Sequence, residues 1–164
     1  MIPVVSVVGY SNSGKTTLLV KIIKELKNRG YKVATIKHHH KEVEIDTPGK
    51  DTWRHAQAGA DTVVLASPSK VAIIEQTPRE ISLDEISGKI SGVDIIFTEG
   101  FKRENKPKIE VFRSSVHDHL ITPAEELLAV ASDVKFDGVP CFDLNEPGAL
   151  VDFLVERYIT PNSR

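Results

Sequence analysis

The segment from Gly9 to Thr16 has the residue types and the spacing of a phosphate-binding loop. It matches the pattern G-x-x-x-x-G-K-[ST] and follows an apolar run, Ile2 to Val8. Such a loop turns backbone N–H groups toward phosphate oxygens, and the helix N-terminus behind it adds positive potential. Lys15 is expected to reach the β- and γ-phosphates, and the Thr16 hydroxyl to help hold Mg²⁺. The residues predicted to bind the triphosphate are Gly9, Ser11, Asn12, Ser13, Gly14, Lys15 and Thr16.

A second chemical group stands at the end of another apolar run. The segment Val93 to Gly100 is nearly continuous in apolar residues and ends in Glu99. A buried parallel strand has this composition, and in phosphate-loop enzymes the acid at its end lies beside the metal. Glu99 is therefore predicted to be a metal-site and catalytic residue together with Thr16 and Lys15.

Two further acids follow the predicted strand Tyr31 to Lys37. The polar segment His38 to Lys50 is too long for a simple connector, which is typical of a functional loop. Either Asp46 or Asp51 could ligate Mg²⁺ or position the attacking water. The alternative for Asp51 is that it caps the next helix.

Basic side chains flank these acids. Lys50 and Arg54 could neutralise phosphate charge or form surface ion pairs. The run His38 to His40 invites a metal site, but adjacent residues of an extended segment point to opposite sides. Polar contacts to a nucleotide or cofactor are the favoured interpretation.

The rest of the chain alternates short apolar runs with helical patterns. This alternation predicts an α/β protein with the three-layer fold of phosphate-loop NTPases: a mostly parallel twisted sheet flanked by helices, plus a β-hairpin insertion built into the sheet. The whole chain, residues 1–164, is predicted to be a single nucleotide-binding domain. Predicted strands are Val4–Val8, Tyr31–Lys37, Thr62–Ala66, Val71–Glu75, Val93–Gly100, Lys108–Phe112, Leu128–Ala131 and Pro140–Asp143. Predicted helices begin at Lys15, Asp51, Ser82, Thr122 (a short helix or turn) and Gly148, the last capped by Asn145.

Bulk properties narrow the class of protein. The 164 residues carry a net charge of −2, which gives no general basic footprint for nucleic acid. Cys141 is the sole cysteine and lies in an apolar stretch, so a buried structural thiol is expected. The N-terminus leads directly into the first strand and leaves no room for a signal peptide, and no apolar run reaches the ~18 residues of a membrane span. A cytoplasmic protein without membrane contact is expected.

Three segments together carry a resemblance to a known family. They are the phosphate loop, the stretch Ile36 to Arg54 with its histidines and Asp-x-Pro-Gly-Lys-Asp-x-x-Arg pattern, and Thr98 to Lys102, which reads Thr-Glu-Gly-Phe-Lys. In these segments, and in length and order of elements up to Pro147, the chain resembles the molybdopterin-guanine dinucleotide biosynthesis protein B (MobB) family. The phosphate loop alone is common to many families, and the combination is far narrower.

This resemblance implies a GTP-binding protein with weak GTPase activity. It further implies a homodimer that acts beside the molybdenum cofactor guanylyltransferase, which attaches GMP to molybdopterin. Gly9 to Thr17 would bind the phosphates, which adds Thr17 to the predicted ligands. Glu99 would replace the usual metal-site Asp; being one methylene longer, it could serve in the outer shell of Mg²⁺ or as a weak general base. Molybdopterin itself is a further candidate ligand.

Recognition of the base is not carried by a known motif. Guanine-specific switch proteins commonly use Asn-Lys-x-Asp, and the nearest string here, Asn105 to Lys108, ends in lysine. Asp133 follows a late predicted strand and could accept from guanine, because strand ends converge at the nucleotide edge of such sheets. A turn or helix-capping Asp is the alternative. The preference for GTP thus follows from the resemblance.

Three functions remain open at this level. The first is a slow GTP-hydrolysing adaptor with no evident water-orienting Gln, in which Arg54 or Arg113 is the candidate arginine finger and Asp51 a candidate catalytic acid. The second is a small-molecule kinase using ATP or GTP, for which Lys102 to Lys106 is the only candidate lid. The third is a binding module that never hydrolyses its nucleotide.

Overall fold

The chain forms two compact units, seen in a computed structural model that describes residues 1–159. Of the described residues, 1–38 and 83–159 make up one, which we call the phosphate-loop unit, and residues 39–82 make up the other, the hairpin unit. Each unit is described by itself below. The division concerns compactness, and the single nucleotide-binding domain over residues 1–164 stays a prediction.

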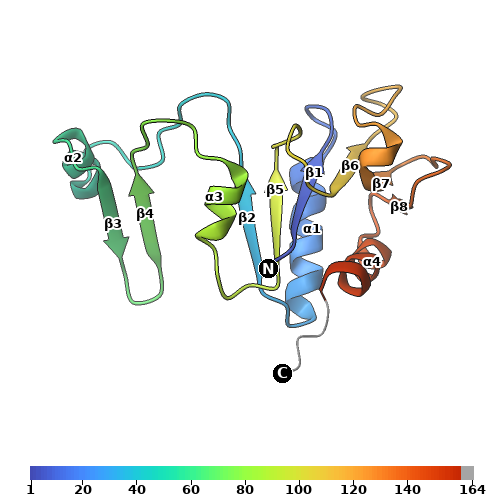
Figure 1. The fold of residues 1–164 in the computed structure, drawn as a ribbon, viewed down its shortest axis with the longest axis horizontal. Coiled ribbons are helices and arrows are strands. Elements are labelled where there is room, and N and C mark those ends of the chain that lie inside the picture. The colour runs from blue at the N-terminus through green and yellow to red at the C-terminus, as the bar shows by residue number, and fades with distance from the viewer. Residues whose placement is uncertain (160–164) are drawn as a thin grey trace. The chain divides into compact units, whose positions relative to one another are not determined.

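The phosphate-loop unit is built on a six-stranded sheet in the order β2-β5-β1-β6-β7-β8 (Figure 1). All five strand pairings are parallel. The strands are β1 Val4–Val8, β2 Val33–Lys37, β5 Ile95–Glu99, β6 Lys108–Phe112, β7 Leu127–Ser132 and β8 Cys141–Asp143. The order places β1 in the middle, between the strand that ends in Glu99 and the strand that precedes Arg113. Parallel strands share a direction, so the ends of all these strands lie at one edge of the sheet.

Helices cover both faces of this sheet. On one face lie α1 (Lys15–Asn28) and α4 (Gly148–Tyr158), whose buried residues Leu18, Ile22 and Leu154 join a core with Phe97. On the other face, α3 (Leu83–Gly88) buries Leu83 against Ile36 and Ile96. Successive residues of β5 alternate between the two cores because side chains of a strand point to opposite faces. These three layers confirm the predicted fold class.

The hairpin unit holds α2 (Asp51–Gln57) and the antiparallel pair β3 (Thr62–Ala66) and β4 (Val71–Glu75). The prediction that this hairpin is built into the main sheet was wrong, because β3 and β4 form a sheet of their own. The physical reason is visible in the burial. A strand inside the large sheet is covered on both faces, as β5 is, whereas Val64 and Ile73 are 54% and 64% exposed.

Most element boundaries agree with the pattern-based predictions, but two other expectations near the C-terminal end were wrong. Asn145 does not cap α4: the N-cap residue is Pro147, and the Asn145 N–H instead donates to Asp143 Oδ1 at 2.6 Å. Cys141 is only half-buried, against the cluster of Phe112, Val130 and Val139. The segment at 122 resolves into a 3-10 turn, η1, Ala124–Glu126.

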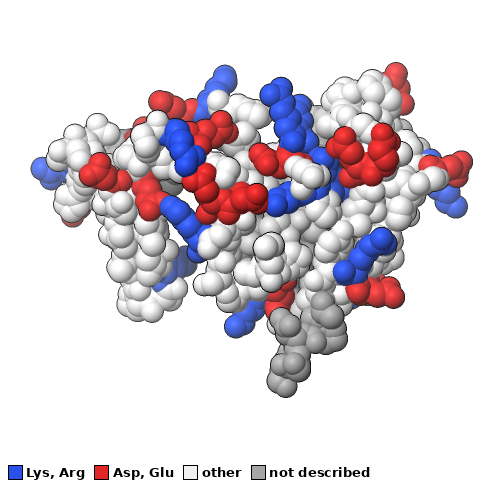
Figure 2. All heavy atoms as spheres, in the orientation of Figure 1, with Lys and Arg blue, Asp and Glu red and all other residues white. Residues whose placement is uncertain are grey.

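Two surface properties complete the description. Within residues 1–159, no helix combines the length and the apolar character that crossing a bilayer requires. Lys and Arg side chains are interspersed with Asp and Glu on the face drawn in Figure 2. That face therefore carries no extended field of a single sign.

Candidate functional site

The phosphate loop leaves the end of β1 and leads into α1. Gly9 has φ +139°, and a Cβ built there would come within 2.5 Å of the Val111 carbonyl oxygen, so only glycine allows the loop to cross β6 so closely. Gly14 has φ +98° and is the N-cap residue of α1. Asn12 is also left-handed, with φ 64°. The glycine spacing of the motif is therefore explained by backbone geometry.

Lys15 is held over this loop by the loop's own carbonyls. Its Nζ donates to Tyr10 O at 2.6 Å and to Gly9 O at 3.1 Å. An ammonium has three donors, so one remains for another acceptor. Partial burial lowers the pKa of Lys15. The negative charge of Glu99 opposes this lowering, and the positive charges of Lys37 and Lys102 add to it. The loop thus positions a cation before any phosphate arrives.

Thr16 and Glu99 meet on the β5 side of the loop. The Thr16 hydroxyl lies 2.9 Å and 3.0 Å from the two carboxylate oxygens of Glu99 and donates to that carboxylate. Lys37 Nζ lies 3.7 Å from Glu99 Oε1. The structure thereby brings together two of the three residues predicted to hold the metal, although they are 83 positions apart in the chain.

These residues surround a cavity of about 420 Å³. Its lining consists of Ser11, Asn12, Gly14, Lys15, Thr16, Thr17 and Glu99. Six of the predicted nucleotide ligands and the predicted catalytic acid therefore face one space. Ser13 lies beneath it: its hydroxyl is buried and, within the described part of the chain, has no hydrogen-bond partner.

The oxygen donors of this cavity fit Mg²⁺. A hydroxyl and a carboxylate are ligands that a hard cation prefers, and Mg²⁺ commonly completes its shell with substrate phosphates and water instead of a full set of protein ligands. Within residues 1–159, no three His, Cys, Asp or Glu side chains are grouped so that they could hold a metal by themselves. Thr16 and Glu99 therefore suit a metal that arrives with a phosphate.

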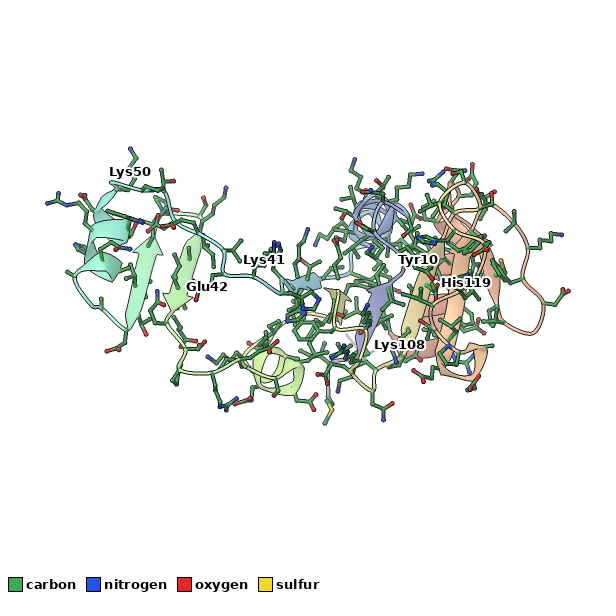
Figure 3. All side chains as sticks on the ribbon, turned by 90° about the horizontal axis from the view of Figure 1, so that it is seen from above. Tyr10, Lys41, Glu42, Lys50, Lys108 and His119 are labelled. Carbon is green, nitrogen blue, oxygen red and sulfur yellow. The ribbon has the colours of Figure 1, made fainter. Side chains whose placement is uncertain are left out.

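The remaining predicted acids belong to the hairpin unit. Asp46 accepts from the Thr47 N–H at 2.7 Å and lines a cavity of about 540 Å³ beside Trp53. Asp51 is not the N-cap of α2, which is Lys50, but lies in the first turn, where a carboxylate suits the helix dipole. Figure 3 shows Lys50 at this end of the hairpin unit. The metal and catalytic roles of Asp46 and Asp51 stay predictions.

Asp133, the predicted base reader, lies at the end of β7 as expected. Both of its oxygens are engaged: Oδ1 accepts from the Ser114 N–H at 2.8 Å and Oδ2 from the Ser114 hydroxyl at 3.0 Å. These bonds, that of the backbone N–H first, lower the pKa of Asp133. The carboxylate thus fixes the turn after β6, and its role toward a base stays a prediction.

Sequence reasoning missed a ring cluster beside the phosphate loop. The Tyr10 ring stacks on His117 with centroids 3.1 Å apart. The Tyr10 hydroxyl lies 2.7 Å from His119 Nε2, and Figure 3 shows Tyr10 and His119 next to each other. His119 Nδ1 donates to Asp118 Oδ1 at 2.5 Å, since a carboxylate only accepts, which leaves Nε2 to accept from Tyr10. No pattern in the sequence signals a contact across 109 positions.

A second missed residue carried a visible signal. Glu110 interrupts the apolar run of β6, is fully buried, and accepts from the N–H groups of Ile121 and Thr122 at 2.8 and 3.0 Å. A carboxylate in a buried strand requires such partners. Glu110 and Asp133 therefore tie both ends of the segment 113–122 to the sheet.

The fold and site together define a parallel α/β protein with a phosphate-loop motif at the end of its central strand. The family model for molybdopterin guanine dinucleotide synthesis protein B matches residues 4–133. The chain is 38% identical over 156 residues to the molybdopterin-guanine dinucleotide biosynthesis adapter protein of Haemophilus influenzae, covering 93% of this chain and 88% of that one. To the Escherichia coli adapter protein it is 37% identical over 163 residues, covering 95% and 93%.

Solved structures give the same result. Bacillus subtilis MobB superimposes with a TM-score of 0.76 at 27% identity, covering 98% of this chain and all of that one. A crystal structure of molybdopterin-guanine biosynthesis protein B gives a TM-score of 0.72 at 32% identity, covering 93% and 98%. The chain belongs to the molybdopterin guanine dinucleotide synthesis protein B family, which confirms the resemblance.

Proposed function

We propose that this chain binds GTP with Mg²⁺ at the segment Gly9 to Thr17 and serves as an accessory protein in molybdopterin-guanine dinucleotide biosynthesis. The accessory role is supported by the family and by relatives named as adapter proteins of that pathway. The nucleotide site is supported above all by one observation, the Lys15 ammonium held between two loop carbonyls and next to the Thr16–Glu99 pair.

The residues of the cavity have distinct tasks in this proposal. Lys15 neutralises the terminal phosphates, and the loop N–H groups donate hydrogen bonds to the phosphate oxygens at the N-terminus of α1. Thr16 and Glu99 would hold Mg²⁺, which when bound neutralises phosphate charge. Glu99 also orients or polarises a water. Slow hydrolysis is expected, because among the described residues that line the cavity Glu99 is the single acid and none is an arginine that could stabilise charge on the γ-phosphate.

The kinase alternative gains no support from its candidate lid. Lys102 to Lys106 forms a turn in which the Glu104 N–H donates to Phe101 O, and Lys106 pairs with Asp84 at 2.6 Å. A lid must carry free cations onto the phosphates. The adaptor function therefore remains the one proposed.

The proposal includes a homodimer that works in the cytoplasm beside the guanylyltransferase. One face of the hairpin, formed by Val64, Ala66, Val71 and Ile73, is apolar and exposed. An apolar sheet face of this kind favours burial against another protein surface. A second copy of the chain supplies an identical apolar face, which suits a two-fold contact.

Calorimetric titration with GTP, ATP and molybdopterin, each with and without Mg²⁺, tests the site. Lys15→Ala should weaken GTP binding about ten- to hundredfold, because hydrogen bonds to a charged group contribute about 1.5–3 kcal/mol. The melting temperature should not change, since Lys15 faces the cavity and not the core. Lys24→Ala, an exposed lysine of α1, is the matched control and should bind as the wild type does.

Each result decides part of the proposal. Unchanged GTP affinity in Lys15→Ala would show that the nucleotide does not bind at this loop. Tighter binding of ATP than of GTP would overturn the proposed preference for guanine. Phosphate release that disappears in Lys15→Ala would exclude a module that only binds. A phosphorylated acceptor appearing when labelled GTP is incubated with a metabolite pool would restore the kinase.

A further inference from the structure

We propose that Arg113 binds the α-phosphate of the nucleotide, from the side of β1 opposite Glu99. The inference rests on the nucleotide site proposed above and adds to it a residue that the motif does not contain. It also changes the role of Arg113 from an arginine finger to a binding residue on the nucleoside side.

The position of Arg113 follows from the sheet order. It is the first residue after β6, and β6 pairs directly with β1, whose end carries the phosphate loop. Its guanidinium reaches back over the start of α1: a Cβ built on Gly14 would lie 3.5 Å from Arg113 Nη2. Gly14 lines the phosphate cavity and immediately precedes Lys15. The guanidinium therefore stands at the rim of that cavity.

No contact within the described residues accounts for the position of the Arg113 guanidinium. Arg113 is half-buried, and within residues 1–159 its side chain makes neither a hydrogen bond nor an ion pair. The positive charge of Arg113 adds to the Ser114 hydrogen bonds in lowering the pKa of Asp133. Both carboxylate oxygens of Asp133 accept from Ser114, however, and not from Arg113. A partly desolvated cation with five unused donors in a fixed fork suits a phosphate group.

The side of β1 on which Arg113 lies determines which phosphate group of the nucleotide it can contact. Glu99 and Thr16 occupy the β5 side of β1 and mark where the metal and the β- and γ-oxygens belong. Arg113 occupies the β6 side, so a nucleotide lying across these strand ends presents its α-phosphate and nucleoside to Arg113. An arginine finger must touch the γ-phosphate, which this arrangement places on the other side.

The segment that carries Arg113 is held in place on both sides. The Ser114–Asp133 bonds fix the residue after it, and the Val116 and His117 N–H groups donate to Arg113 O at 2.9 and 3.2 Å. The Tyr10–His117 stack then joins this turn to the phosphate loop itself. The guanidinium is therefore presented by a fixed backbone, as an oriented phosphate contact requires.

A ligand series tests the assignment. Affinities of GTP, GDP, GMP and guanosine are measured by competition against a labelled GDP for wild type, Arg113→Ala and Arg113→Lys, with Arg157→Ala, an exposed arginine of α4, as the control. In Arg113→Ala, the three phosphorylated ligands should all weaken by a similar factor of about ten to a hundred, and guanosine should not change. Arg113→Lys should recover part of the loss because it keeps the charge without the fork.

Other outcomes overturn the proposal in distinguishable ways. A lower GTP turnover with unchanged GDP and GMP affinity would make Arg113 a finger, and an equal loss for guanosine would place it on the base. If the wild type binds nucleotide and Arg113→Ala binds every ligand equally well, the role of Arg113 is overturned and the proposed nucleotide site stands. A wild-type protein that binds no nucleotide would overturn the proposed function together with this inference.

Discussion

The two units of this chain bury apolar surface to very different extents. In the phosphate-loop unit, helices cover both faces of a six-stranded sheet, and residues such as Phe97, Ile22 and Leu154 are fully buried. In the hairpin unit, Val63 is the single buried hydrophobic residue among the described ones. A two-stranded hairpin is marginally stable alone, so the second unit depends on further contacts in a way that the first does not.

The two proposed functions, binding of a nucleotide and association with another protein, fall on different sides of this contrast. The preformed cavity, with Lys15 already in place, belongs to the well-buried unit, where a rigid sheet holds strand ends in register. The exposed apolar face belongs to the poorly buried unit, whose elements gain stability when covered. A binding site for a small anion needs the first property, and an adaptable protein-binding surface is compatible with the second.

Truncation of a core residue in each unit should show the largest contrast. Phe97→Ala should lower the free energy of unfolding by about 3–5 kcal/mol, because it removes a fully buried ring from β5. Val63→Ala should reduce hydrogen-exchange protection of residues 62–75 while leaving the phosphate-loop unit unchanged. Denaturation followed by hydrogen exchange with mass spectrometry measures both. Equal destabilisation of the phosphate-loop unit by the two variants would show that the units unfold as one.

A charge on the exposed hairpin face should separate association from stability. Ile73→Lys places an ammonium in the apolar face, so the proposed dimer should dissociate while the melting of the phosphate-loop unit stays the same. Val20→Lys, at an exposed apolar position of α1, is the control. Sedimentation velocity reports the mass of each variant. A dimer that survives Ile73→Lys would move the interface elsewhere.

The smallest expected effect is the response of nucleotide affinity to pH. Because the pKa of Lys15 is lowered, its ammonium is half-deprotonated at a pH below the ordinary lysine value of 10.5. GTP affinity should therefore decline as the pH rises through the alkaline range, and GTP binding should take up a proton there. Calorimetry in buffers of different ionisation enthalpy detects the uptake. Glu99→Gln removes the charge that opposes the shift, so its decline should begin at lower pH; a flat profile up to pH 10.5 would contradict a titrating Lys15.

Local patterns predicted the elements of this fold and the centre of its site. The strands β1 and β6 and the helix α4 have the predicted bounds, because short apolar runs and helical spacing are local signals. The phosphate loop could be predicted for the same reason, since glycines at fixed positions are required by the backbone of the loop itself. The position of Glu99 at the end of a buried strand was predictable from the apolar run that precedes it, whereas its catalytic and metal roles stay predictions.

Contacts between distant segments could not be predicted in this way. The placement of β5 between β1 and β2, and the separation of the hairpin from the main sheet, depend on pairings that no local pattern encodes. The Tyr10–His119 contact and the orientation of Arg113 depend in turn on that sheet order. Asn145 does not cap α4 because the helix begins at Gly148, which makes Pro147 the N-cap residue and leaves Asn145 two positions too early.

The point at which the chain enters the hairpin unit is tied to the end of β5. His38 is the last residue before the chain enters that unit, and its N–H donates to Glu99 O at 2.9 Å. Its ring stacks on Phe101 with centroids 4.4 Å apart, and a Cβ at Gly100 would come within 3.0 Å of its own Cβ. The residue that leads into the hairpin unit is thus held by contacts with three consecutive residues, Glu99 to Phe101. A ligand that displaced the Glu99 backbone would therefore also disturb the hydrogen bond that holds His38, the residue at which the phosphate-loop unit ends.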